Sequence, residues 1–215
     1  MLPPREIPSL ADENGRLPNS LVVFAAKVSL GQIRTSEIGL EVRGQIEKIR
    51  AAGIEPSHVD SHKHTHAHPV VMDVIGTVAQ DCGIRRVRKP IEDLRSAWAG
   101  AGLSRQLAAA AAVRVVARRF EAISRKYGLR APDHFLGLAM TGQLGPAALR
   151  RMIETLPEGV IEIMLHPGIC DADLASTGSR LQRQRQLELD GLLDPDVQRT
   201  VEKEGIQLMG YGGLN

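Results

Sequence analysis

The stretch "HVDSHKHTHAHP", residues 58–69, holds five of the seven histidines of the chain. Its first residues belong to a short segment, Ser57–Ser61, that is predicted to be a β-strand, and the remaining histidines follow that strand. Side chains of an extended segment alternate between its two faces. While the extended backbone lasts, one face would therefore carry a carboxylate and several imidazoles: His58, Asp60, His62, His64 and His66. We expect these side chains to converge at the carboxyl end of a strand.

This residue set matches the chemistry of a divalent metal. Nitrogen and oxygen donors without a thiolate are typical of catalytic metals that keep open positions for water. Such a metal takes about three protein ligands, so some of the histidines must orient the others or face the substrate. The alternative is that they are loop histidines, either solvated or capping the helix that follows.

Helices and strands are predicted to alternate along the rest of the chain, with Gly and Pro at their ends. The expected helices are 20–33, 35–52, 69–81, 104–127, 145–156, 180–192 and 195–204. The expected strands are 57–61, 84–90, 133–140, 159–167 and 206–211. This pattern predicts a parallel α/β fold in a single domain covering residues 1–215.

In parallel α/β folds, ligands bind at the carboxyl ends of the strands. His166 occupies such a position in "IEIMLHPGICD" and is a candidate general acid or orienting residue, unless it is a satisfied core histidine. Arg88, in "VRKP", could hold an anionic or hydroxyl-rich substrate or form an ion pair. His134 lies at the start of a strand and is expected to be structural.

The composition excludes several classes of protein. A net charge of +2 and a pI near 8.7, without aromatic residues between the arginines, do not indicate nucleic-acid binding. The longest apolar run, 107–117, is interrupted by Arg114 and is too short to span a bilayer. The N-terminus lacks the order of a signal peptide, and two distant cysteines argue against a disulfide framework. We therefore expect a cytoplasmic protein.

The histidine motif, together with the later "EIMLHPG", resembles the YdjC-like carbohydrate deacetylases, which include chitooligosaccharide deacetylases. "LPPREIPSLADENGRLPN", "FLGLAMTG" and "LPEGVIEIMLHP" resemble more narrowly the hopanoid-biosynthesis-associated branch of that family. The resemblance covers essentially the whole chain. It implies a (β/α) barrel-like fold of the YdjC and polysaccharide-deacetylase type.

The resemblance also implies a site with a divalent metal. His62 would be a metal ligand, Asp60 and His64 would lie in or near its shell, and His166 would line the site. We assign catalytic roles to His166 and Asp60, and substrate binding to Arg88 and His64. The donor types fit Zn, Mn, Co or Fe, and the family also allows Mg.

The implied reaction removes an N-acetyl group from an amino sugar, and an N-acetylglucosaminyl hopanoid glycolipid is the substrate suggested by the branch. In the family, the metal polarises the amide carbonyl and binds the attacking water, and a carboxylate takes the proton of that water.

Members of the family open with a strand carrying Ala-Asp-Asp-Phe-Gly, which supplies the base and a ligand, and a further ligand histidine follows. This sequence has neither motif and begins at the "LPPREIP" loop. We therefore expect a chain that is incomplete at the N-terminus, of doubtful activity and with weak metal affinity.

Two alternatives remain open. One is a metal hydrolase of the amidohydrolase or phosphoesterase type, although those sites recruit further histidines or a lysine from later strands. The other is a non-catalytic metal-binding remnant. The expected partner is a small amino-sugar or glycolipid substrate, and a homo-oligomer is compatible with the sequence.

Overall fold

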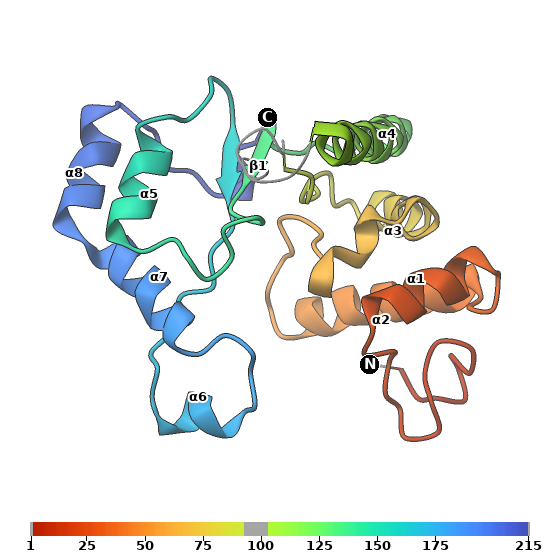
Figure 1. Cartoon of the computed structure of the whole chain (residues 1–215). Helices are drawn as coiled ribbons and strands as arrows, with labels where there is room; N and C mark the ends of the chain where they lie inside the picture. The colour runs from red at the N-terminus through yellow and green to blue at the C-terminus, as the bar shows by residue number, and fades with distance from the viewer. Residues whose placement is uncertain (1, 93–102, 215) are drawn as a thin grey trace. The chain divides into compact units, whose positions relative to one another are not determined.

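The computed structural model describes the backbone of residues 2–92 and 103–214 (Figure 1). The chain forms two compact units. The first unit comprises Met1–Ile91, Ala111–Ala131 and Gly210–Asn215. The second unit comprises Glu92–Ala110 and Pro132–Met209. Each unit is described separately below.

The first unit is built mainly from helices. Its described elements are α1 (Leu21–Ser29), α2 (Thr35–Ala51), the 3-10 segment η1 (His62–Ala67), α3 (Pro69–Asp81), the greater part of α4 (Leu103–Lys126) and the short η2 (Tyr211–Gly213). Its strand pairing is reduced to parallel bridges that join Val59 to Val87 and Arg86 to Arg130. The Val59 N–H donates to Arg86 O over 3.0 Å, and the Arg88 N–H donates to Val59 O over 3.0 Å. The extended segment that leads into His62 is therefore joined to its neighbour at a single residue, Val59.

The second unit contains a pair of parallel strands, β1 (His134–Leu136) and β2 (Ile161–Ile163), in which Phe135 lies opposite Glu162. Its helices are α5 (Pro146–Ile153), α6 (Ala172–Ser176), α7 (Arg183–Leu193) and α8 (Pro195–Lys203). Its apolar core joins α5 to α8 through Leu149, Ile153 and Val197. Gly137 must be a glycine because its φ is +96° and a Cβ would lie 2.4 Å from Met164 O.

Most predicted helices are confirmed within a few residues at their ends, and every strand pairing in the described residues is parallel, as expected. The strands are much shorter than predicted. The predicted strand at 206–211 is wrong, because 206–210 have no regular structure. Leu208 there is 80% exposed, so no apolar face is buried that would fix a strand. The short helix α6 was not predicted, and the structure does not establish a barrel.

The N-terminal loop is irregular, as its prolines predicted, but it is tightly anchored. Ile7 is fully buried and Leu10 nearly so, in the apolar cluster shared with α2 and α3. The buried Glu37 of α2 accepts hydrogen bonds from Ser9 N (2.7 Å), Ser9 Oγ (2.8 Å) and Leu10 N (3.2 Å). Burial alone would raise the pKa of Glu37, but these hydrogen bonds and Arg34 lower it overall.

Of the helices in the described part of the chain, none has the combination of length and apolarity needed to cross a membrane.

Candidate active site

The histidine-rich turn, residues 58–68, departs from the extended backbone that its alternation predicted. The extended backbone lasts only to Ser61, and Lys63 and His64 then adopt φ values of 53° and 55°. The predicted shared face of five alternating side chains is therefore wrong beyond Ser61. The strand pairing stops at Val59. The backbone after Ser61 is therefore shaped by hydrogen bonds within the turn, such as that from His64 N to Ser61 O (3.0 Å).

Left-handed backbone at two successive non-glycine residues is costly, at about 1–3 kcal/mol each, and such strain clusters at functional sites. Contacts on either side hold the turn in this conformation. The Lys63 ammonium donates to Asn19 O over 2.9 Å, and the His68 N–H donates to Thr65 O over 3.1 Å. The turn is therefore a fixed feature of the first unit.

His66 is the buried histidine of the turn, with no exposed surface. Its Nε2 lies 2.9 Å from Arg88 O, and because a carbonyl can only accept, Nε2 carries the proton. Its Nδ1 lies 2.5 Å from Ser61 Oγ, which also accepts from His66 N (3.0 Å) and Thr65 Oγ1 (3.0 Å). The hydroxyl of Ser61 then donates to Nδ1. Burial lowers the pKa of His66 and keeps this ring neutral.

Asp60 is held as an anion by groups on both of its carboxylate oxygens. Oδ1 accepts from Ser61 N (2.7 Å), and Oδ2 forms an ion pair with Arg88 Nη1 (2.5 Å). The nearest nitrogens of His64 and His66 each lie 3.9 Å from Oδ1. Burial would raise the pKa of Asp60, but the His64 ring, the Ser61 N–H and the Arg88 charge together lower it. Such a carboxylate is a weak proton acceptor at neutral pH and a strong electrostatic partner.

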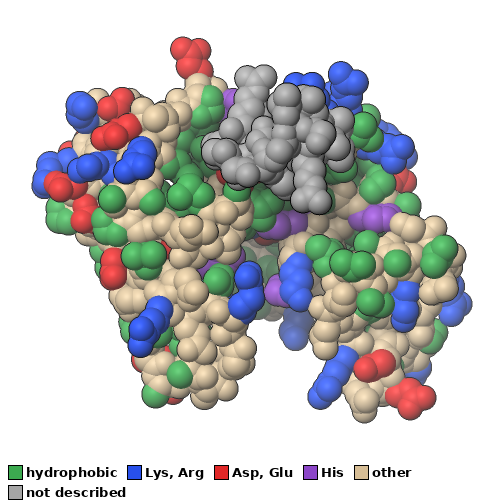
Figure 2. Space-filling model, viewed as in Figure 1, with side chains coloured by type: hydrophobic (Ala, Val, Ile, Leu, Met, Phe, Trp, Pro, Cys, Tyr) green, Lys and Arg blue, Asp and Glu red, His purple; other side chains and the backbone are tan. Residues whose placement is uncertain are grey.

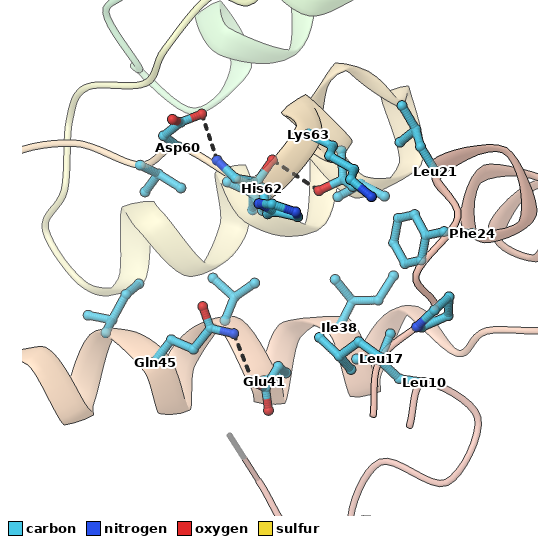
Figure 3. Close-up of a pocket in the computed structure, with 18 of the residues that line it drawn as sticks. Leu10, Leu17, Leu21, Phe24, Ile38, Glu41, Gln45, Asp60, His62 and Lys63 are labelled. Carbon is cyan, nitrogen blue, oxygen red and sulfur yellow. Dashed lines mark hydrogen bonds between the residues drawn. The ribbon is translucent and has the colours of Figure 1, made fainter. Parts of the chain in front are cut away.

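His62 differs from both neighbours because its side chain is exposed and lines a cavity of about 620 Å³ in the first unit. Figure 3 shows His62 and Lys63 on one wall of this cavity, facing α2, with Phe24 of α1 pointing in from the side. Within the described residues, no protein hydrogen bond to its ring is recorded. His58 also lines this cavity, but its ring stacks on Tyr211 and its Nδ1 lies 2.9 Å from Ser57 Oγ, so His62 is the more exposed of the two imidazoles.

The cavity, which we call the first-unit cavity, has a mixed polar and apolar lining. Its polar residues are Asp60, Ser61, His62 and Lys63 of the turn, Glu41 and Gln45 of α2, and Arg16 and Asn19 of the N-terminal loop. Its apolar lining comes from the N-terminal loop, α1, α2 and α3 and includes Leu17, Phe24, Ile38, Val42, Val71 and Ile75. Its volume is in the ordinary range for small-molecule sites, about 300–1,000 Å³.

The residues of the turn do not form a complete metal site. Both ring nitrogens of His66 are occupied by protein groups, and Asp60 is paired with Arg88. In the part of the chain with described side chains, no three His, Cys, Asp or Glu residues are grouped to hold a metal ion. Among the described residues the turn therefore does not assemble the three or so ligands that a catalytic metal takes.

In the second unit, His166 follows β2 and is held by α7. The fully buried Glu188 accepts hydrogen bonds from His166 N (2.5 Å) and Gly142 N (2.6 Å). The same carboxylate lies 3.8 Å from His166 Nδ1. Arg185 O accepts from Gly168 N over 3.2 Å. The helix therefore fixes the backbone on both sides of Pro167.

Sequence reasoning missed two residues that organise these sites. The Ser61 hydroxyl bonds to His66 and Thr65 and so holds the turn together. In the sequence, only the presence of a hydroxyl at the end of the extended segment could have indicated this. Glu188 holds the His166 loop by accepting from His166 N and Gly142 N. In the sequence, its only indication was that it is a carboxylate on a helix with a small apolar face. Of the predicted residues, the structure brings together Asp60, His64 and Arg88. Their roles in binding and catalysis, and that of His166, stay predictions.

Comparisons with known proteins agree with the motif. The family model described as "YdjC-like protein" matches residues 1–203. A carbohydrate deacetylase from Geobacillus stearothermophilus is 29% identical over 97% of this chain and 70% of its own length. One from Brevibacillus brevis is 28% identical over 98% of this chain and 72% of its own. The human carbohydrate deacetylase is 29% identical over 89% of this chain and 64% of its own.

A solved structure shares the fold. The crystal structure of a candidate cellobiose-phosphate cleavage protein from Enterococcus faecalis V583 aligns with a TM-score of 0.71 over all of this chain and 72% of its own. The sequences are 20% identical, so this likeness concerns the fold alone. The match of the family model over nearly the whole chain shows that this protein belongs to the YdjC-like family.

Proposed function

We propose that this protein is a carbohydrate deacetylase, a hydrolase that removes the N-acetyl group from an amino sugar. The observation that carries the proposal is the family match over residues 1–203, which spans both strand-end histidine motifs. The curated relatives named carbohydrate deacetylases come from bacteria and vertebrates, which supports a shared activity. In this proposal His62 and Asp60 contribute to the site, and His64, Arg88 and His166 serve the substrate or its protonation.

Asp60 and His62 are suited to different roles in the proposed site. Asp60 supplies fixed negative charge, since the His64 ring, the Ser61 N–H and the Arg88 charge together lower its pKa. His62 faces the first-unit cavity and can contact a ligand. The family's Asp-Asp motif does not occur in this sequence. We therefore propose that acetate release by this chain is slow, and that divalent metal binding is weak.

The lining of the cavity supports a glycolipid substrate. The cavity has polar groups at the turn and at Arg16, Asn19, Glu41 and Gln45, and apolar side chains between them, so its lining suits a substrate with both a sugar part and an apolar part. The loop that resembles the hopanoid-associated branch contributes Leu10, Arg16, Leu17, Pro18 and Asn19 to the wall. We propose that the acetamido sugar lies at His62 and that the apolar aglycone, a hopanoid in this branch, fills the rest.

Acetate release tests the activity. The chain would be assayed with N-acetylglucosaminyl lipid and added Zn²⁺ or Mg²⁺. A second version would carry a strand with the Ala-Asp-Asp-Phe-Gly motif that the family resemblance implies, fused ahead of it. We expect at least 100-fold faster release from the fusion, and loss of that gain in His62→Ala. The exposed Glu47→Ala variant is the matched control. A folded fusion that releases no acetate would refute the proposed activity.

The substrate class has a separate test. Phe24→Ala enlarges the cavity and removes an apolar contact, so we expect KM for the glycolipid to rise about 5–20-fold. KM for a water-soluble N-acetylated chitooligosaccharide should stay within twofold. Leu193→Ala, at a 64% exposed position of the second unit, is the control. Equal changes with both substrates would argue against an apolar aglycone in the cavity.

A further inference from the structure

A polar pair interrupts the apolar stripe that α2 contributes to the first-unit cavity. The residues of α2 that line the cavity follow one another at helical spacing: Ile38, Glu41, Val42, Gln45, Ile46 and Ile49. All are apolar except Glu41 and Gln45, which lie one helical turn apart. Gln45 Nε2 donates to Glu41 Oε1 over 2.8 Å. The two side chains therefore act as one polar unit in this wall.

Glu41 fixes the orientation of the Gln45 amide. Glu41 is only 3% exposed, and each of its carboxylate oxygens has a donor. Oε2 accepts from Leu2 N over 2.8 Å, and Oε1 accepts from Gln45. Because an ionised carboxylate can only accept, the NH2 group of Gln45 has to face Glu41. The amide oxygen of Gln45 is then directed away from Glu41.

Anchoring the N-terminal loop does not require this glutamine. Glu37, one turn earlier on α2, holds the N–H groups of Ser9 and Leu10 in the same loop. Its carboxylate is paired with Arg34 over 2.8 Å rather than with a glutamine. Glu41 can hold Leu2 N in the same manner. What Gln45 adds is an amide oxygen at the cavity.

That oxygen is presented to the cavity as a hydrogen-bond acceptor. Figure 3 shows it directed from α2 toward the wall that carries His62. Gln45 is exposed, and among the described residues no donor to its amide oxygen is recorded. A carboxylate that accepts from the NH2 group polarises the amide, and this polarisation strengthens the oxygen as an acceptor. A ligand in the cavity can therefore use it.

A fixed acceptor selects the polarity of the group placed against it. A hydroxyl or an N–H satisfies it, whereas a carboxylate, phosphate or ether oxygen leaves it unpaired. The Glu41 charge behind the amide further disfavours an anion at this point. The exposed His62 lies on the opposite wall, and Figure 2 shows histidine side chains at the surface of the first unit.

We propose that Gln45 is a specificity-determining residue, whose amide oxygen accepts a hydrogen bond from a hydroxyl of the sugar. Glu41 is a positioning residue that keeps this oxygen, rather than the NH2 group, toward the ligand. The need for a donor is a property of the cavity and does not depend on the reaction. Its assignment to a sugar hydroxyl rests on the proposed function, in which the acetamido group lies at His62.

Calorimetric titration of the full chain tests the role of Gln45. The probes are octyl N-acetylglucosaminide and its analogues with fluorine in place of the hydroxyl at C3, C4 or C6. Fluorine is close to a hydroxyl in size but cannot donate. We expect one analogue to bind wild type about fivefold more weakly than the parent glycoside. In Gln45→Met that analogue and the parent should bind within about twofold of each other. Gln80→Met, at an exposed position of α3, should keep the wild-type pattern.

Glu41→Gln tests the positioning role. The new amide keeps an oxygen for Leu2 N and offers its NH2 group to Gln45. The Gln45 amide then turns over, so that its NH2 group faces the cavity. We expect the discrimination against the fluorinated analogue to fall to about twofold or less while the fold is retained. A purely structural role of Glu41 would leave the ranking of the glycosides unchanged, and that result would refute its positioning role.

Circular dichroism checks the fold of each variant, and Gln45→Ala replaces Gln45→Met if that variant does not fold. A wild-type chain that does not bind the parent glycoside, or that binds all the glycosides equally, overturns the proposal. So does discrimination that persists in Gln45→Met. Coupling between Gln45 and one hydroxyl, without acetate release from the fusion, would refute only the proposed activity. Acetate release without such coupling would refute only the role of Gln45.

Discussion

The histidine-rich turn of the first unit and the His166 loop of the second unit are both strand ends, but they are held in opposite ways. In the turn, side chains bond to one another: Ser61 bonds to His66, and Asp60 to Arg88. In the loop, one buried carboxylate, Glu188, fixes the backbone N–H groups of His166 and Gly142.

The difference shows that a histidine at a strand end has no single role. In the turn, the buried His66 uses both ring nitrogens to hold the structure, and the exposed His62 faces the cavity. In the loop, positioning is carried by a helix, and the histidine contributes its backbone. Burial and hydrogen bonding, rather than position in the motif, distinguish the structural His66 from the exposed His62.

The largest expected effect is the loss of stability when Glu188, which holds the His166 loop, is replaced. Glu188→Ala leaves the buried N–H group of Gly142 and the partly buried N–H group of His166 without their acceptor. Each unsatisfied group costs about 1–3 kcal/mol, so we expect the free energy of unfolding to fall by about 3–5 kcal/mol. Urea denaturation measures it, with the exposed Glu202→Ala as control. A loss below about 1 kcal/mol would show that water or another group replaces the carboxylate.

Within the turn, replacing two histidines separates their roles. His66→Ala removes two hydrogen bonds and leaves a buried cavity, so we expect a loss of about 2–4 kcal/mol. His62→Ala changes an exposed side chain and should stay within about 0.5 kcal/mol of wild type. Thermal or urea unfolding of both variants measures the contrast. Equal losses would contradict the assignment of His66 as the structural histidine.

The pH dependence of stability follows from the same burial. Burial lowers the folded-state pKa of His66 and also that of His68, below the ordinary value near 6.5 of the unfolded chain. Below that value the unfolded state binds more protons, so stability is complete above pH 6.5 and is lost as pH falls toward the folded pKa. The slope is at most about 1.4 kcal/mol per pH unit for each group.

Urea midpoints between pH 7.5 and 5 measure this slope. His66→Gln should give a shallower slope than wild type, and His62→Ala should keep the wild-type slope. A slope unchanged by His66→Gln would mean that His66 is protonated equally in both states.

The smallest expected effect concerns the ion pair of Asp60. Arg88→Gln removes the cation but keeps the Arg88 backbone carbonyl that His66 uses. We expect the pKa of Asp60 to rise toward its ordinary value, and stability to fall by about 1 kcal/mol or less because the pair is partly exposed. Carboxyl ¹³C NMR titration follows Asp60 directly. A pKa of Asp60 that does not change would show that the hydrogen bonds, rather than Arg88, hold the carboxylate ionised.

The helices could be predicted because their signals are local. Thr35–Ala51 and Pro69–Asp81 are marked by apolar periodicity, by Pro69 at one start and by Gly53 and Gly83 beyond the ends. The strands were overpredicted because pairing depends on neighbours that a local pattern does not contain. Residues 206–211 include several apolar side chains, but Leu208 is exposed rather than packed against a neighbour. No strand therefore forms there.

The composition of the candidate site could be predicted, but its internal order could not. The motif indicated that Asp60 and the histidines belong together. Alternation alone could not show that the backbone turns at Lys63 and His64, which buries His66 and exposes His62. The role of Glu188 could not be predicted from the sequence, because its partner Gly142 is 46 residues away and only the folded chain brings them together.

The division between His62 and His66 is tested most directly by imidazole ¹⁵N NMR of the chain during titration with Zn²⁺. We predict that His66 shows a single neutral tautomer with the proton on Nε2, and that added metal does not move its signals. His62 should shift progressively, with weak affinity, and His62→Ala should remove the response. Displacement of the His66 signals, or tight binding of one equivalent of metal through several histidines of the turn, would contradict this division.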